Sequence, residues 1–317
     1  MTRSVSRPAL VLNGAAFSEQ TDFGTALLGA DVDVVFRDID EIAIDIGPGC
    51  VRIWETVDGR DLRDFGLVQV LAYHRPTASL LNAVADYAAA NGVRAVNIAG
   101  IGAPTKLFKY VRLASRGLSV PLTIYRPARL LTDGYEDMAS HLDLPFVLKT
   151  VTGGSGRLTS LVGNERAFGR RLGDVEHARV GFLAQEFVPP DGSYLLLVLG
   201  GEVSLAMRYQ GVDDMLIRPV WDDASLIEVH DLDHEARQTA VRAAASLDYD
   251  VAGVHLVRHW TTGQWCLLDV NPNPLTSGDR YAADRIDAYA AYLKRRLAQP
   301  VPSDRYESSD AGVGHRQ

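Results

Sequence analysis

The stretch Pro145-Phe-Val-Leu-Lys149, followed by the glycine-rich run Gly153-Gly-Ser-Gly-Arg157, decides the fold of this chain. A lysine at the end of an apolar strand can place a fixed positive charge where phosphate oxygens gather. A loop of small residues lets backbone N–H groups approach those oxygens closely. The run is not a Walker loop, because no Gly-Lys-Ser/Thr follows it and no helix opens directly after it. Taken alone, these residues could equally form a plain hairpin turn beside a solvent-exposed lysine.

A second stretch, Phe182 to Pro190, is a candidate for contact with an adenine. It predicts a strand that ends in the polar pair Gln185-Glu186 and is then terminated by prolines. Such a strand could present backbone groups and the Glu186 carboxylate to an adenine and its ribose. A simple strand end, stopped by the two prolines, is the alternative.

A third stretch, Leu267 to Pro274, predicts oxygen ligands for a metal ion. Asp269 and Asn271 lie two residues apart in a strand, so their side chains point to the same side. Carboxylate and carbonyl oxygens, together with phosphate, are the ligands that magnesium prefers. The alternative is a strand that ends in an Asn-Pro turn.

Around these stretches, apolar strand-like runs alternate with segments of helical spacing, which is typical of an α/β fold. Residues 1–102 have the pattern of a small doubly wound unit. The sequence predicts strands at residues 8–14, 32–46, 50–55, 67–72 and 95–98, short strands and turns between 121 and 162, and a strand, turn and strand over 182–203. It predicts helices at residues 77–91, 104–117, 234–248 and 281–297, and a hairpin over 251–274.

Composition narrows the classes of function. The chain has 317 residues, of which 47% are hydrophobic, and this predicts a large core in roughly two or three domains. The net charge of −8 argues against a nucleic-acid partner, and no apolar run is long enough to predict a membrane partner. The N-terminus lacks the pattern of a secretory signal. Cys50 and Cys266 lie in strand-like runs and are expected to be buried free thiols, which fits the cytoplasm.

In their order along the chain, these segments resemble the ATP-grasp family, in the branch of glutathione synthetase and the ligases that add glutamate to ribosomal protein termini. The resemblance covers roughly residues 90–295. It implies an α/β ATP-grasp fold preceded by the doubly wound domain of residues 1–102. The N-terminal ATP-grasp subdomain would span 103–180 and the C-terminal subdomain, with the metal site, 181–299. The polar residues 300–317 are expected to form a disordered tail.

The resemblance also assigns roles to residues. It implies that two lysines and the glycine-rich loop bind the phosphates of ATP: Lys106, Lys149, Gly153, Gly154, Ser155 and Gly156. It implies that the hinge Gln185, Glu186, Phe187 and Val188 holds the adenine, and that Asp269 and Asn271 bind Mg²⁺.

The chain departs from the family pattern in three ways. Ser193 and Leu195 stand where an acidic residue and an arginine are common, so that Arg208 or Arg218 would have to supply the charge at the reacting groups. Ser193 is nevertheless expected to be among the residues that bind the nucleotide. His255 stands where an aspartate usually binds magnesium, and imidazole suits zinc, manganese or nickel better. Asp269 replaces the usual glutamate, which is one methylene longer.

The expected activity is therefore that of the family: ATP-dependent ligation of a carboxylate to an amine through an acylphosphate, with Mg²⁺ or Mn²⁺. The expected partners are ATP and small-molecule or peptide carboxylate and amine substrates, and the oligomeric state stays open. Two alternatives remain. One is a catalytically weakened ATP-grasp protein that binds nucleotide or a partner without ligating. The other is a different ATP-grasp chemistry, such as that of a kinase or a carboxylase component.

Overall fold

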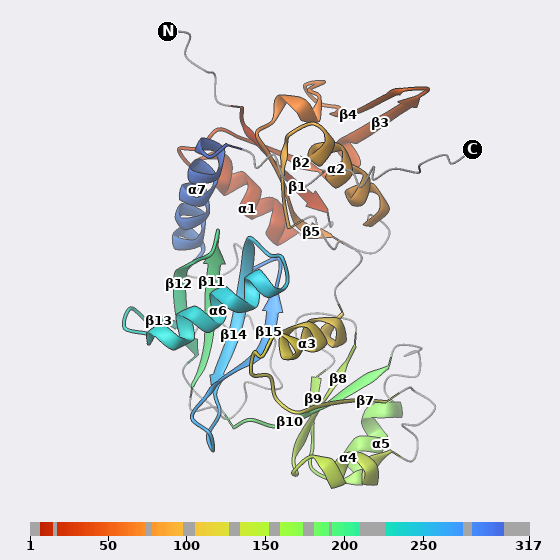
Figure 1. The fold of residues 1–317 in the computed structure, drawn as a ribbon, viewed down its shortest axis with the longest axis vertical. Helices are drawn as coiled ribbons and strands as arrows, with labels where there is room; N and C mark the ends of the chain where they lie inside the picture. Colours follow the sequence, from red (N-terminus) through yellow and green to blue (C-terminus); the bar gives the residue numbers. More distant parts are fainter. Residues whose placement is uncertain are drawn as a thin grey trace, which may run out of the picture. The chain divides into compact units, whose positions relative to one another are not determined.

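The computed structural model describes residues 7–14, 18–73, 78–97, 105–126, 134–151, 159–173, 181–189, 192–209, 226–274 and 281–300. The chain forms two compact units, which Figure 1 draws as a ribbon. Unit 1 comprises residues 1–101 and 290–317, and unit 2 comprises residues 102–289. Helix α7 (Ala282–Ala298) begins in unit 2 and ends in unit 1. Residues 301–317 of the predicted tail lie outside the described residues.

Unit 1 is built on a parallel sheet with the strand order β2-β1-β5-β6, as the doubly wound pattern predicts. The strands are β1 (Ala9–Gly14), β2 (Val34–Asp38), β5 (Leu67–Tyr73) and β6 (Arg94–Val96), with helices α1 (Ser18–Leu28) and α2 (Ala78–Ala90) and the 3-10 turn η2 (Leu62–Asp64). Leu10, Leu12 and Val68 pack with Leu81 and Val84 of α2 in one buried core. The strands of this sheet consist of near-continuous apolar residues, such as Ala9–Leu12 in β1, and this pattern is typical of parallel strands.

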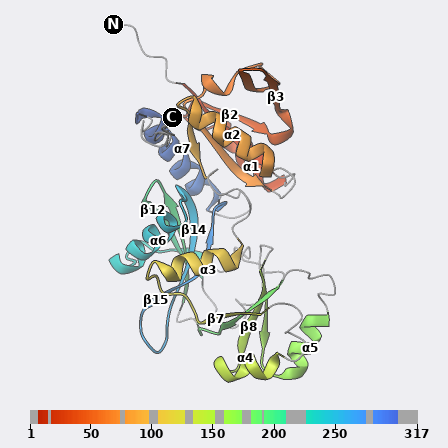
Figure 2. The same cartoon turned by 45° about the vertical axis from the view of Figure 1, so that its right-hand side comes forward.

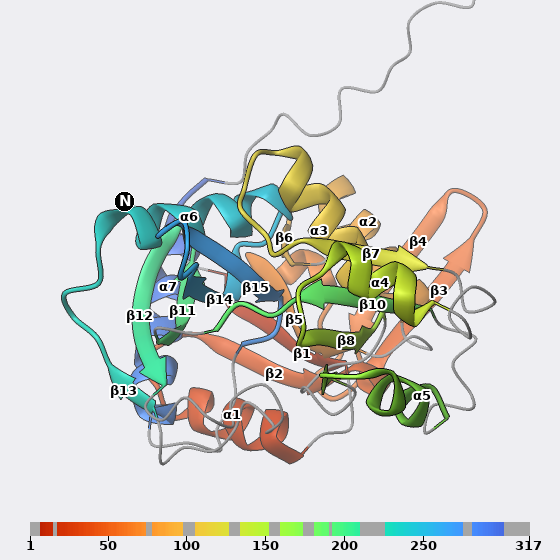
Figure 3. The ribbon, with the colours of Figure 1, turned by 90° about the horizontal axis from the view of Figure 1, so that it is seen from below.

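The predicted strand over residues 32–46 is wrong as a single element. Strand β2 stops at Asp38, and the 3-10 turn η1 (Ile39–Glu41) follows. The Glu41 carboxylate accepts a hydrogen bond of 2.9 Å from the Asp38 N–H, which stabilises the turn. The chain then forms an antiparallel hairpin of β3 (Ile42–Gly47) and β4 (Cys50–Glu55), seen from below in Figure 3.

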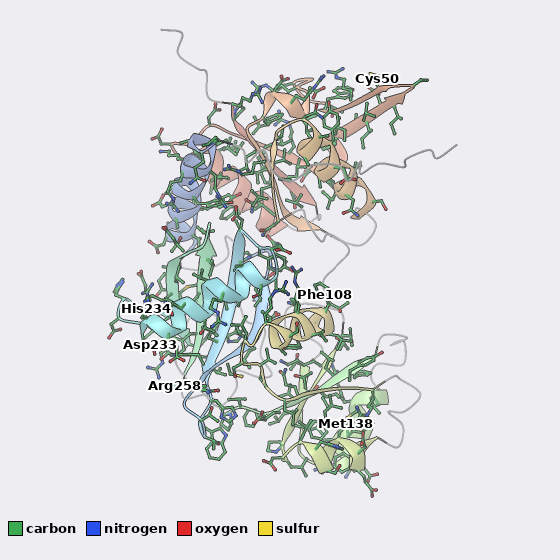
Figure 4. All side chains as sticks on the ribbon, viewed as in Figure 1. Cys50, Phe108, Met138, Asp233, His234 and Arg258 are labelled. Carbon is green, nitrogen blue, oxygen red and sulfur yellow. The ribbon has the colours of Figure 1, made fainter. Side chains whose placement is uncertain are left out.

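The cysteines were both expected to be buried, and this is wrong for one of them. Cys50, labelled on the β3–β4 hairpin in Figure 4, is exposed because it follows the hairpin turn. Cys266 is buried, and both cysteines are free thiols.

Unit 2 contains two antiparallel sheets. The first has the order β7-β10-β8-β9. Its strands are β7 (Thr123–Arg126), β8 (Phe146–Thr150), β9 (Thr159–Val162) and β10 (Phe182–Glu186), accompanied by helices α4 (Tyr135–His141) and α5 (Glu165–Gly173). The rings of Tyr135, Phe146 and Phe168 lie with centroids 5.8–6.4 Å apart in tilted and edge-on contacts, and this aromatic cluster joins both helices to the sheet. Figure 2 shows α4 and α5 beside this sheet.

The second sheet has the order β13-β12-β11-β14-β15. Its strands are β11 (Ser193–Leu199), β12 (Glu202–Tyr209), β13 (Leu226–Glu228), β14 (Val251–Arg258) and β15 (Trp265–Asn271). Helix α6 (His234–Ser246) packs four buried alanines on one face, against alternate strand residues such as Leu196 and Leu256. The other face carries Ser193, Leu195, His255 and Asp269.

Helix α6 begins where the Asp233 carboxylate accepts a 2.7 Å hydrogen bond from the Ala236 N–H (Figure 4). The same carboxylate accepts from the indole N–H of Trp265 at 3.0 Å. Helix α3 (Lys106–Ser115) begins after Thr105, and the segment that follows it is joined to β15 by the 2.9 Å bond from the Leu267 N–H to the Ser119 carbonyl. No helix within the described ranges is long and apolar enough to cross a membrane.

Candidate functional site

Lys149 lies at the end of β8, as the apolar run before it predicts. Its ammonium donates a 2.6 Å hydrogen bond to the side-chain amide oxygen (Oε1) of Gln185 and lies 3.4 Å from the Tyr110 hydroxyl. Gln185 in turn donates to the Thr123 hydroxyl at 2.8 Å, which fixes its amide. Burial lowers the pKa of Lys149 to about 8, although the Asp269 carboxylate opposes that change. The structure therefore brings two predicted nucleotide-binding residues, Lys149 and Gln185, into contact.

A second lysine, Lys109, reaches the predicted metal ligand. Its ammonium forms an ion pair with the Asp269 carboxylate and donates a 2.8 Å hydrogen bond to the Val270 carbonyl. The residue is only 8% exposed. The sequence prediction assigned the early lysine role to Lys106 alone and missed Lys109. The available signal was spacing, because residues three apart in a helix share one face.

Lys109 contacts the Asp269 carboxylate, and Lys106 and Lys149 also act on it electrostatically. Partial burial alone would raise the pKa of Asp269, but Lys109, Lys106 and Lys149 outweigh it and hold that pKa well below its usual range. The pKa of Lys106 is lowered by burial, and the neighbouring Lys109 and Lys149 add to that effect while Asp269 opposes it. The cluster keeps excess positive charge, which suits a polyphosphate.

His255 is held by a protein partner. Its Nε2 shares a hydrogen bond with the Ser193 hydroxyl, and in the sheet it stands opposite Asp269. Ser193 is 2% exposed. Burial lowers the pKa of His255 to about 4, with Lys149 adding to the effect against Asp269, so the imidazole is neutral at pH 7. The structure thus brings Ser193 and His255 together and gives each a partner within the protein.

The donor atoms at the end of β15 determine whether Mg²⁺ fits this site. Asp269 and Asn271 share one face, and Asn271 closes the following turn through 3.0 Å bonds with Asn273. Gly253 leaves room for that turn, since a Cβ there would lie 2.8 Å from Pro274. No group of three acidic, histidine or cysteine residues gathers in the described part of the chain. One carboxylate with a nearby amide fits an ion that arrives with phosphates, whereas the bonded His255 does not fit magnesium.

The predicted adenine hinge forms the end of β10 and the residues after it. Glu186 donates its backbone N–H to the Leu122 carbonyl at 2.8 Å, and its carboxylate lies 3.1 Å from the His259 ring. Val188 is buried beside Val257 and Cys266. The Glu186 side chain therefore has protein partners, and the backbone around Phe187 is the part of the hinge left to approach a base.

The structure does not bring Arg208 to the lysine cluster. Arg208 pairs with Tyr194 across β11 and β12, and its guanidinium lies 5.7 Å from the Tyr194 ring centroid. Because strand side chains alternate, both lie on the α6 face, opposite Ser193 and Asp269. Arg218 and the glycine-rich Gly153, Gly154, Ser155 and Gly156 lie outside the described residues.

Solved ATP-grasp proteins share this architecture. The ATP-grasp ligase PsnB, complexed with precursor peptide PsnA2 and AMPPNP, superposes with a TM-score of 0.63 at 15% identity and covers 92% of this chain and 98% of its own. The macrocyclase MdnC from Microcystis aeruginosa MRC, bound with precursor peptide MdnA, gives 0.64 at 13% identity, covering 91% and 99%. At such identities the likeness shows the fold alone. It confirms the predicted ATP-grasp fold.

Sequence comparison identifies the family. A probable alpha-L-glutamate ligase of Parasynechococcus marenigrum (strain WH8102) is 27% identical over 65% of this chain and 46% of its own length. One from Alkalilimnicola ehrlichii (strain ATCC BAA-1101 / DSM 17681 / MLHE-1) is 28% identical over 59% and 62%. The chain thus spans less than two thirds of either relative. The RimK-like ATP-grasp domain matches residues 112–291, more than half of the chain. The chain belongs to the RimK-like ATP-grasp family.

Proposed function

We propose that this protein is an ATP-dependent carbon–nitrogen ligase that joins a carboxylate to an amine through an acylphosphate. The observation that carries the proposal is the Lys109–Asp269 ion pair, on whose carboxylate Lys106 and Lys149 also act, within an ATP-grasp fold. Three ammonium groups around one carboxylate leave positive charge for a polyphosphate. We propose that two ATP-grasp subdomains, residues 103–180 and residues 181–299, carry out this reaction together.

The residues of the cluster would act by positioning and by charge. Lys149 and Lys106 would hold phosphate oxygens, and Gln185 would keep the Lys149 ammonium in place. The hinge backbone near Phe187 would hold the adenine, and Asp269 with Asn271 would accept Mg²⁺ carried by the nucleotide. That ion, when bound, would supply further neutralisation of the phosphate charge. Such chemistry needs no protein nucleophile, because the substrate carboxylate attacks the γ-phosphate and an amine displaces phosphate afterwards.

The substrates we propose are an amino acid or a peptide on each side of the new bond. The sequence relatives are named as probable alpha-L-glutamate ligases, and the structural neighbours PsnB and MdnC bind precursor peptides. Arg218 and the loop Gly153–Gly156 remain proposed contacts of the phosphates. Mn²⁺ is the proposed alternative metal, and the two free cysteines favour a reducing cytoplasm as the location.

A second candidate function is nucleotide binding without ligation. It is favoured by the Ser193–His255 pair, which occupies the sheet face beside Asp269 with neutral groups. Neutral side chains at this position would bind a second metal ion more weakly, and they would stabilise the charge of the transferred phosphate group less. ADP release, measured with carboxylate and amine substrates, separates the two candidates.

The first test is calorimetric titration with ATP, in the presence of Mg²⁺ and then of Mn²⁺, on the wild type and on Lys149→Ala. We expect binding that depends on metal and that Lys149→Ala weakens by a factor on the order of a hundred, because a buried charge-assisted contact is lost. Lys294→Ala is the matched control, since Lys294 pairs with Asp31 in unit 1. Absence of ATP binding with either metal would refute the ligase proposal.

A further inference from the structure

We propose that Lys109 is an internal counter-ion of Asp269, which competes with the metal ion for this carboxylate and so sets the metal affinity of the site. The inference rests on the proposed role of Asp269 as a metal ligand, and its second measurement also rests on the proposed nucleotide site. In the metal-free protein Lys109 neutralises Asp269. When a metal ion arrives with the nucleotide, the ion takes the carboxylate and the ammonium turns to the phosphates.

The position of the Lys109 ammonium is fixed by two acceptors on one strand. It pairs with the Asp269 carboxylate and donates a 2.8 Å hydrogen bond to the Val270 carbonyl. One turn of α3 is tied to the same strand, because the Tyr110 hydroxyl donates a 2.6 Å bond to the Leu268 carbonyl. The helix therefore aims Lys109 at β15 before any ligand binds.

Competition follows from the geometry at Asp269. Its Oδ1 accepts both the Lys109 ammonium and the Val270 N–H, the latter at 2.9 Å. An ion that binds Oδ1 must displace the ammonium, because cation ligand distances are shorter than hydrogen bonds and like charges repel. The two side chains differ in access, since that of Asp269 is 44% exposed and that of Lys109 is 10% exposed. An ion can therefore approach the carboxylate from solvent, whereas the ammonium that it must displace from Oδ1 lies on the buried side.

The neighbouring charges determine the direction of the effect. Lys106 and Lys149 also act on Asp269, so a bare divalent ion would join three ammonium groups around one carboxylate. That arrangement disfavours a metal ion without phosphates. It also leaves enough fixed positive charge for a nucleotide to bind before the metal does. Lys109 thereby reduces the difference in nucleotide affinity between the metal-bound and the metal-free protein.

The first measurement is the binding of Mn²⁺ alone, followed by water-proton relaxation, to the wild type, Lys109→Met and Lys109→Arg. We expect Lys109→Met to bind Mn²⁺ at least about tenfold more tightly than the wild type, because the competing charge-assisted contact is gone. Lys109→Arg keeps the charge and should stay near the wild type. A lysine with a merely structural role would leave the affinity unchanged or lower it on removal, and that result would overturn the proposal.

Two further variants place the effect at this carboxylate. Asp269→Asn, combined with Lys109→Met, should lose the gained Mn²⁺ affinity. Lys294→Met removes a lysine of the same kind from an exposed ion pair in unit 1 and should bind Mn²⁺ as the wild type does. A gain in Lys294→Met equal to that in Lys109→Met would assign the effect to net charge and overturn the proposal.

The second measurement uses AMPPNP with EDTA and with Mn²⁺. Lys109→Met should weaken metal-free AMPPNP binding about tenfold and should increase the gain that Mn²⁺ brings, because phosphates lose one ammonium while the ion gains Asp269. If no variant binds AMPPNP but Lys109→Met still gains Mn²⁺ affinity, the proposed function fails and the counter-ion role stands. If AMPPNP binds and both metal responses match the wild type, the counter-ion role fails and the proposed function stands.

Discussion

At the scale of single residues, burial brings the pKa of Lys149 into the pH range in which binding assays are made. Burial lowers the pKa of this lysine to about 8, partly opposed by Asp269, whereas an exposed lysine keeps its proton to much higher pH. The charged form is the one that can bind phosphate. Phosphate binding therefore favours the protonated state, and raising the pH through the pKa of the free protein must weaken it.

We predict that ATP affinity is nearly constant below pH 7 and falls by about tenfold for each pH unit above the pKa of Lys149. Calorimetric titration at several pH values up to 9.5 would measure it. Lys149→Arg is the control, because a guanidinium stays protonated throughout and should remove the decline above pH 8. Equal ATP affinity of the wild type at pH 7 and pH 9.5 would contradict this prediction.

At the scale of elements, helix α6 approaches the sheet closely because its buried face is made of alanine. Ala236, Ala240, Ala243 and Ala244 are all at most 1% exposed. Interiors are packed as densely as organic crystals, so this interface has no room for larger side chains without movement of the helix.

We predict that Ala243→Leu lowers the free energy of unfolding of unit 2 by about 1–3 kcal/mol through overpacking. The matched control is Ala245→Leu, on the exposed face of the same helix, where the change should stay within about 0.5 kcal/mol. Urea unfolding followed by fluorescence would compare the two variants. Equal destabilisation by both would show that the alanine face does not pack as described.

At the scale of the whole molecule, the chain returns to its first unit at the end. Arg94 of β6 donates hydrogen bonds of 2.6 and 2.8 Å to the carbonyls of Arg296 and Pro300. Lys294 pairs with Asp31 at 2.8 Å. The last turns of α7 are thereby fastened to unit 1, although some 200 residues separate Arg94 from Arg296.

We predict that Leu293→Ala destabilises unit 1 by about 2–4 kcal/mol, because Leu293 is fully buried in the part of α7 that belongs to that unit. Hydrogen exchange read by mass spectrometry should show lost protection in β1, β5 and α2. Protection in β11 and β14 of unit 2 should persist. Ala243→Leu should give the reverse pattern, and loss of protection throughout in both variants would contradict two separately stable units.

The sequence by itself determined the local elements and their order. The hairpin over residues 251–274, helix α6 and the strand that carries Lys149 follow from periodicity and turn residues, which act over a few positions. Alternation also placed Asp269 and Asn271 on one side of a strand. The strand predicted over 32–46 failed where a short turn, stabilised by Glu41, interrupts an otherwise strand-like pattern.

The tertiary structure alone decided which of these residues meet. Lys109 pairs with Asp269, which lies 160 positions away in the sequence, and Ser193 of β11 contacts His255 of the neighbouring strand β14. Arg208 was a reasonable candidate by composition, but the register of β11 and β12 turns it to the α6 face. Periodicity fixes the side of an element on which a residue lies, whereas its partner depends on how distant elements pair and pack. For that reason the sequence predicted Lys106, Lys149 and Asp269 as site residues, and only the fold assigned Lys109 to Asp269.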